Sequence, residues 1–152
     1  MPNTLIFATE LPAEVTPDLL QKVFSSVLKA VDWRLKGTIS LAFTNKADSQ
    51  RINKQFAGND YATDVLSFVY KKDILRTEDE IIGEIAICTP IAIEQAHQYG
   101  SNISSEVALL LTHGLLHLNG ADHQTKSEQA SFEDIQSAIM KSLKLIYHTM
   151  PW

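Results

Sequence analysis

Apolar and polar residues along the 152-residue chain follow two periods, one typical of strands and one typical of helices. Four short runs are rich in β-branched and aromatic residues, and five other stretches have the composition or the three-to-four-residue apolar spacing of helices. The predicted elements are, in order, a strand at 4–8, a helix at 17–31, a strand at 38–44, a helix at 46–56, strands at 64–70 and 81–88, and helices at 90–99, 104–118 and 127–145. This order predicts a single α/β (α+β) domain over residues 1–152, with about five helices on a mixed sheet of about four strands. Residues 148–152 are expected to form a loose tail.

Short local signals predict the ends and irregularities of these elements. Threonine followed by proline, at 16–17 and again at 89–90, predicts an N-cap with proline at the first helical position. Gly83, inside an apolar strand, predicts a bulge or a close backbone approach. Alternation in the strand at 38–44 predicts an outward face that carries Thr38, Ser40 and Ala42.

The helix at 104–118 is apolar on nearly every side, which predicts a central, buried element. It carries His113 and His117, which stand on one face because they are four residues apart. Gly120 permits a left-handed residue that ends the helix, and the resulting turn can bring His123 towards the other two imidazoles.

Three neutral imidazoles on a rigid support provide what a zinc site with an open fourth position requires. A metal also removes the cost of burying imidazoles without partners, about 1–3 kcal/mol for each unsatisfied polar group. We therefore predict one Zn2+ per chain, bound by His113, His117 and His123. The same spacing occurs in metzincin peptidases, H-E-x-x-H-x-x-G-x-x-H, but Gly114 replaces their general-base glutamate, so a peptidase is the weaker interpretation.

The histidine segment resembles the signature of a known family. HGLLH at 113–117 and GADH at 120–123 are similar to the H-G-x-L-H-L-x-G-x-D-H motif of the YbeY family, bacterial rRNA maturation factors. The resemblance extends to TDVLSF at 63–68, similar to T-[DN]-V-L-S-F, and to the strand residues at 83–85 and 87–88. It implies a zinc-dependent, single-strand-specific endoribonuclease, a hydrolase acting in 16S rRNA 3′-end maturation and ribosome quality control.

Three further residues are candidates for the catalytic site. Asp122 could accept an imidazole N–H and fix the tautomer of a ligand, or it could be a solvated turn carboxylate. Glu84 interrupts an apolar strand and could line the cleft or face water. Ser67 is a candidate through the family resemblance.

Basic residues that could contact RNA phosphates are few. The candidates are Arg51, Lys54, Lys71, Lys72 and Arg76, although a charge run is usually a solvated face. The net charge of −5 gives no support to an RNA partner, so any RNA site must be a local basic patch. The chain also departs from the family at Ala57, where the family pattern has an arginine.

Composition places the remaining limits on function. The chain has 45% apolar and 20% charged residues, which is ordinary for a globular protein. It shows no apolar run near the roughly 20 residues of a membrane span and no basic N-terminal leader. We therefore expect a cytoplasmic protein with no membrane partner. The single cysteine, Cys88, is expected to be a small buried residue, and His97 and His148 to be surface residues. Single-stranded rRNA or the ribosome is the expected partner, with no small-molecule organic cofactor. The alternatives are a non-catalytic, zinc-containing ribosome-assembly factor and a metallopeptidase that lacks the usual glutamate.

Overall fold

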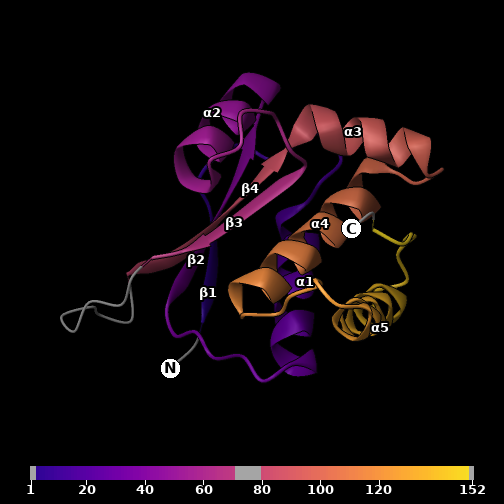
Figure 1. The fold of residues 1–152 in the computed structure, drawn as a ribbon. Helices are drawn as coiled ribbons and strands as arrows, with labels where there is room; N and C mark the ends of the chain where they lie inside the picture. The colour runs from indigo at the N-terminus through magenta and orange to yellow at the C-terminus, as the bar shows by residue number, and fades with distance from the viewer. Residues whose placement is uncertain (1–2, 71–79, 151–152) are drawn as a thin grey trace.

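The structure, a computed structural model, describes residues 3–70 and 80–150 (Figure 1). Its elements follow the predicted order: β1 (Thr4–Phe7), α1 (Pro17–Ala30), β2 (Thr38–Thr44), α2 (Lys46–Ala57), β3 (Val65–Val69), β4 (Ile81–Cys88), α3 (Thr89–Gln98), α4 (Ile103–Leu118) and α5 (Lys126–Ser142). The predicted fold class is confirmed. None of the helices in these ranges combines the length and the hydropathy needed to cross a membrane.

The four strands form one mixed sheet in the order β1-β2-β4-β3. The pairs β1–β2 and β2–β4 are parallel, and β3 runs antiparallel to β4 at one edge. Helix α4 lies along one face of the sheet with α1 and α5 beside it, whereas α2 lies on the side of the opposite face (Figure 1). The three helices therefore cover one face of the sheet, and α2 lies against one end of the other face (Figure 1).

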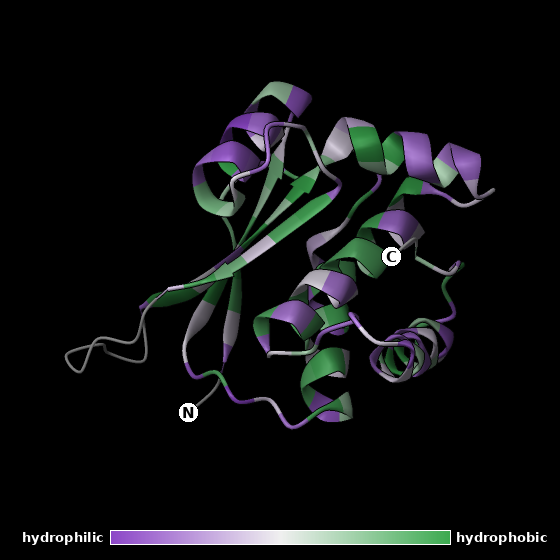
Figure 2. Ribbon diagram, viewed as in Figure 1, coloured by the Kyte–Doolittle hydropathy of each residue, from purple (hydrophilic) through white to green (hydrophobic). Residues whose placement is uncertain are grey.

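Helix α4 is the central helix that the sequence predicts. Thirteen of its sixteen residues are buried, and hydrophobic residues dominate its ribbon in Figure 2, in contrast to the polar surface of α2. The side chain of Asn102 accepts a hydrogen bond from the Ser105 amide and caps the helix N-terminus. Most of the stabilisation of α4 comes from tertiary packing, because apolar side chains leave water on nearly all of its faces.

Gly114 sets the distance between α4 and the sheet. A Cβ at this position would lie 3.0 Å from Ser67 Oγ and 3.1 Å from Ile85 Cγ2. The Ser67 hydroxyl donates a hydrogen bond of 3.1 Å to the Gly114 carbonyl. The glycine therefore lets the helix backbone approach strands β3 and β4 directly, and Ser67 ties the helix to the edge strand.

Several local expectations are confirmed and one is wrong. Thr16 caps α1 through a hydrogen bond from the Leu19 amide. The N-cap of α3 is Cys88, which makes no side-chain capping bond, so Thr89 is the first helical residue and the prediction of a second threonine cap is wrong. Gly83 has both predicted features: the β2–β4 register shifts beside it, and a Cβ at this position would lie 3.3 Å from the Phe68 carbonyl oxygen.

The predicted outward face of β2 is not solvent-facing. Thr38 is 8% exposed and Ser40 is 3% exposed. One reason is that β2 is an inner strand, hydrogen-bonded to β1 on one side and to β4 on the other. Cys88 is buried as predicted.

His148 packs against Glu106 and Tyr99, so it is not the surface residue that the sequence predicted. His148 Nε2 lies 2.8 Å from Glu106 Oε1, and its ring stacks on Tyr99 with centroids 3.7 Å apart. Met150 is 4% exposed, and the end of the predicted loose tail, residues 151–152, lies outside the described residues. His148 is held in this position by its contact with the buried carboxyl group of Glu106. Burial raises the pKa of Glu106, and the hydrogen bond to His148 lowers it.

Candidate metal centre

The three signature histidines converge. His113 and His117 lie one turn apart near the C-terminal end of α4, and Gly120, with φ of 95°, turns the chain so that His123 returns towards them. The Nε2 atoms of His113 and His117 are 3.1 Å apart, and those of His117 and His123 are 3.0 Å apart. Within the described parts of the chain, these three residues form the one group of metal-ligand type, with all ligand atoms within 4.8 Å.

Two of the three separations between these nitrogens are close to those around a tetrahedral metal ion. Nitrogens at about 2.0–2.1 Å from a tetrahedral zinc ion lie about 3.3–3.4 Å apart. The observed separations of 3.1 and 3.0 Å are close to this value. Cys88 is not part of the group, so the described residues supply three ligands, the number found in zinc sites that keep an open position.

The protein environment favours the neutral form of the two inner imidazoles, those of His113 and His117. Burial, and then the neighbouring His117 ring, lower the pKa of His113 to about 3. Burial, followed by the His123 ring, also lowers the pKa of His117, while the Ala121 backbone and Asp122 act in the opposite direction. A neutral imidazole has a free lone pair on one ring nitrogen, which is the form that binds metals.

Helix α5 forms one wall of the centre, a contribution that the sequence analysis missed. The Phe132 ring lies 4.8 Å from the His113 ring, 5.1 Å from that of His117 and 5.6 Å from that of His123, measured between centroids. Phe132 is 2% exposed, so it excludes water from one side of the three rings. Its place in the apolar stripe of the predicted helix was visible in the sequence, but its contact with the histidines was not.

Gln136 is the second missed residue. Its Oε1 atom lies 3.2 Å from Nδ1 of His113, and the side chain is 2% exposed. Gln136 stands one helical turn after Phe132, so both side chains reach His113 from the same face of α5. A polar residue four positions after a buried aromatic residue is the sequence signal that could have found it.

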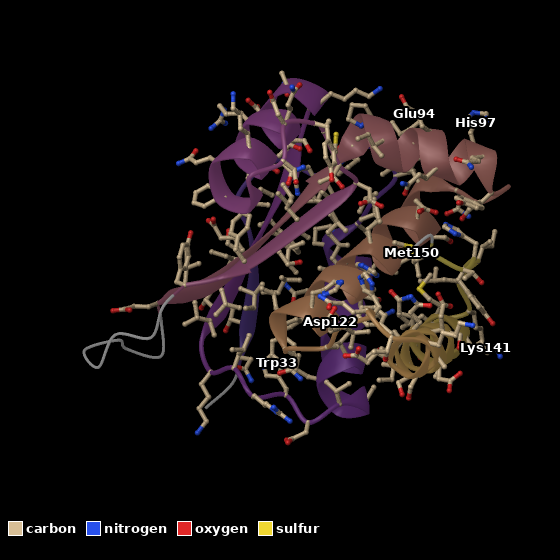
Figure 3. The ribbon with its side chains drawn as sticks, viewed as in Figure 1. Trp33, Glu94, His97, Asp122, Lys141 and Met150 are labelled. Atoms are coloured by element: carbon tan, nitrogen blue, oxygen red, sulfur yellow. The ribbon has the colours of Figure 1, made fainter. Side chains whose placement is uncertain are left out.

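Asp122 lies in the turn between α4 and α5 (Figure 3). Its Oδ1 atom accepts a hydrogen bond of 2.8 Å from the backbone N–H of His123, and its side chain is exposed. This hydrogen bond is thus made with the backbone of a candidate ligand, not with an imidazole. Asp122 therefore shapes the turn that presents His123 and attracts positive charge on His117.

The structure places Glu84 on the other face of the sheet from the histidines. Adjacent strand residues point to opposite faces, and Ile85 contacts Gly114 of α4. Glu84 instead pairs with Ser40 and Phe68 across the strands, and burial together with a hydrogen bond to Glu84 raises the pKa of Tyr70 to about 12. Of the two positions that the sequence left open for Glu84, the structure supports the one away from the histidine cleft.

The remaining candidates are dispersed. Ser67 faces α4 and contacts Gly114, between His113 and His117 in sequence. Arg51 and Lys54 are exposed on α2 and lie near carboxylates, Arg51 3.4 Å from Asp48 and Lys54 3.7 Å from Asp60. The other basic candidates, Lys71, Lys72 and Arg76, lie outside the described residues. His97 is exposed on α3, as predicted (Figure 3).

A buried helix with two imidazoles, a third imidazole after a glycine turn and a four-stranded mixed sheet define an α/β protein with a candidate mononuclear metal centre. A family model described as endoribonuclease YbeY matches residues 7–144. The chain belongs to this family, and the resemblance seen in the sequence is confirmed.

Curated relatives named endoribonuclease YbeY cover most of the chain. The protein of Alkaliphilus oremlandii is 30% identical over 131 residues, covering 85% of this chain and 87% of the relative. That of Lactococcus lactis is 31% identical over 151 residues, covering 90% and 93%. That of Staphylococcus aureus strain JH9 is 34% identical over 113 residues, covering 70% and 73%.

The fold also occurs among solved structures. The solution structure of TM1509 from Thermotoga maritima aligns with a TM-score of 0.58, covering 94% of this chain and 92% of that one. The sequences are 20% identical, so this likeness supports the fold alone.

Proposed function

We propose that the protein is a zinc-dependent, single-strand-specific endoribonuclease that acts in 16S rRNA 3′-end maturation and ribosome quality control. The observation that carries the proposal is the convergence of three Nε2 atoms, with successive separations of 3.1 and 3.0 Å, in a chain of the YbeY family. Ribosomal RNA is the proposed substrate, the ribosome the proposed partner and the cytoplasm the proposed location.

The chemistry proposed is hydrolysis of a phosphodiester bond. His113, His117 and His123 would hold the metal through Nε2, and Gln136 would orient the first of them. Zinc, when bound, supplies a Lewis acid for a phosphoryl group and lowers the pKa of water. Phe132 closes one side of the centre to bulk water, which strengthens electrostatic interactions on that side.

The environment of Gly114 disfavours the peptidase alternative. In the related peptidase motif, this position carries the glutamate that acts as general base. Here a Cβ would already lie 3.0 Å from Ser67 Oγ and 3.1 Å from Ile85 Cγ2, both part of the sheet. A longer acidic side chain would meet the sheet before it reached the imidazoles.

The non-catalytic assembly factor is the second candidate. A zinc ion that only holds the fold usually has four protein ligands, whereas three histidines form the group found in the described residues. Three ligands favour a centre that keeps one position for water or substrate. Catalysis is therefore the preferred proposal, and the assembly factor becomes an outcome of the test.

The test combines metal analysis with cleavage assays on three substrates. Purified protein should carry about one equivalent of zinc and cleave single-stranded RNA, but neither duplex RNA nor casein. His117→Ala should lose both metal and cleavage, because it removes the central ligand of the three. His97→Ala is the matched control, since His97 is an exposed histidine on α3.

Each alternative has its own result. Casein digestion without RNA cleavage would indicate a peptidase. Stoichiometric zinc with no cleavage of any substrate would favour the assembly factor. Stoichiometric metal in both His117→Ala and His123→Ala would refute the ligand assignment.

A further inference from the structure

The contact between Gln136 and His113 assigns a role to a residue outside the histidine motif. We propose that Gln136 is a positioning residue of the metal centre, which holds His113 in the tautomer that binds a metal through Nε2. Because the amide of Gln136 is a neutral acceptor, metal affinity stays below the level that a carboxylate would give. The inference rests on the proposed zinc site and extends it to helix α5.

The geometry fixes where the imidazole proton lies. Oε1 of Gln136 is an acceptor only, and it lies 3.2 Å from Nδ1 of His113. Nδ1 must therefore carry the proton that it donates, and Nε2 is left with a free lone pair. That lone pair faces Nε2 of His117 at 3.1 Å, which is the direction of the candidate metal. Gln136 thus prepares His113 as a ligand before any metal arrives.

Burial makes this hydrogen bond a strong constraint. Gln136 is 2% exposed and His113 is 8% exposed, so water does not compete for the contact. Phe132, one turn earlier on α5, packs on the His113 ring and limits its rotation. Helix α5 is itself anchored beside the centre, because Gln129 Nε2 donates a 3.0 Å hydrogen bond to the His123 carbonyl.

The second atom of the same amide argues against a packing role alone. Among the described residues, Nε2 of Gln136 is buried without a hydrogen-bond partner. An unsatisfied buried donor is unfavourable, and an apolar side chain of similar size would avoid it. The other polar atom, the acceptor Oε1, contacts Nδ1 of His113. This contact is therefore the reason for a glutamine at this position.

The neutral charge of the amide has its own consequence. A carboxylate bonded to the outer nitrogen of a histidine ligand raises the basicity of that ligand and tightens metal binding. It would also place a buried negative charge beside His113 whenever the metal is absent. Gln136 orients the ring without that charge, so the metal-free protein stays folded and the bound metal is held less tightly.

The test measures zinc affinity directly on the full-length protein after removal of metal by a chelator. Zinc is titrated against a competing chromophoric chelator near neutral pH, with wild type, Gln136→Leu and Gln136→Glu. Gln136→Leu should weaken zinc binding about 10–100-fold, the usual effect of losing a partner of a ligating histidine. Gln136→Glu keeps the acceptor and should bind zinc at least as tightly as wild type.

The matched control is Ile139→Ala, which creates a cavity on the same helix at a core residue that is 2% exposed. It should lower thermal stability and leave zinc affinity unchanged. If Gln136→Leu does not fold, Gln136→Met, which is unbranched like glutamine, takes its place.

The outcomes separate this inference from the proposed function. Zinc affinity of Gln136→Leu equal to wild type, or equal weakening in the Leu and Glu variants, would overturn the positioning role. Wild-type protein that binds no zinc would overturn both proposals. Wild-type protein that binds zinc but cleaves no RNA would overturn the endoribonuclease alone, and the affinity order Glu, Gln, Leu would still support the role of Gln136.

Discussion

Replacing Gly114 by alanine tests how closely α4 is pressed against the sheet. The new methyl group would lie 3.0 Å from Ser67 Oγ, 3.1 Å from Ile85 Cγ2 and 3.3 Å from Ile85 Cδ1. Ile85 is fully buried, and Ser67 is held by its hydrogen bond to the Gly114 carbonyl. Neither neighbour is the free end of a long side chain, so the helix must move away from the sheet by a few tenths of an ångström.

Two opposing effects decide the sign of the change in stability. Alanine is favoured over glycine inside a helix by about 1 kcal/mol. Overpacking of a tight core costs about 1–3 kcal/mol. Because both contacts are with well-fixed groups, we expect the upper part of that range and a net loss of about 1–2 kcal/mol. For a domain of this length, that loss lowers Tm by about 2–8 °C.

The assay is urea and thermal unfolding of metal-free protein, since bound metal would add its own stabilisation. A double-mutant cycle with Ser67→Ala identifies the contact: Gly114→Ala should cost less when Oγ of Ser67 is absent. A rise in Tm for Gly114→Ala, or an equal cost with and without the Ser67 hydroxyl, would refute the close approach of helix and sheet.

Two further predictions concern the edges of the domain. Ala57→Arg should raise cleavage of single-stranded RNA about tenfold to hundredfold with unchanged metal content, because a charge-assisted contact with phosphate contributes about 1.5–3 kcal/mol. Ala57 is exposed at the end of α2, so the longer side chain can be accommodated. A folded, metallated variant that is no faster would show that this site does not reach the substrate. His148→Ala should cost about 1–3 kcal/mol at neutral pH, since it leaves buried Glu106 without its imidazole partner. Burial raises the pKa of Glu106, so the Glu106 carboxyl group holds its proton more tightly in the folded state than in the unfolded state. The free energy of unfolding of His148→Ala should therefore fall as pH rises above 4.5, the ordinary pKa of a glutamate. Urea titrations at several pH values should show no such fall in a variant that also carries Glu106→Gln.

The sequence predicted the parts of the centre that depend on local geometry. Two histidines four residues apart share a helix face, and a glycine turn returns a third, so His113, His117 and His123 could be brought together without knowledge of the fold. Phe132 and Gln136 could not be assigned, because the packing of α5 on α4 is a tertiary contact that no local period specifies.

Two other features could not be predicted for the same reason. The direction of Glu84 was open because β4 is apolar on both faces, and such a strand shows no alternation from which to read a register. His148 was placed at the surface because its partner, Glu106, lies 42 residues earlier in an apolar helix. In each case the missing information was which distant element covers the residue.

All three candidate ligands come from an eleven-residue stretch of chain, from His113 to His123. Joining the ends of so short a segment costs little chain entropy, whereas the β1–β2 and β2–β4 pairings must close far longer loops. The candidate metal centre is thus a local assembly within a fold of non-local strand pairs. A metal bound there would therefore cross-link a short local segment at the start of the α4–α5 connection, and it would not join distant parts of the chain.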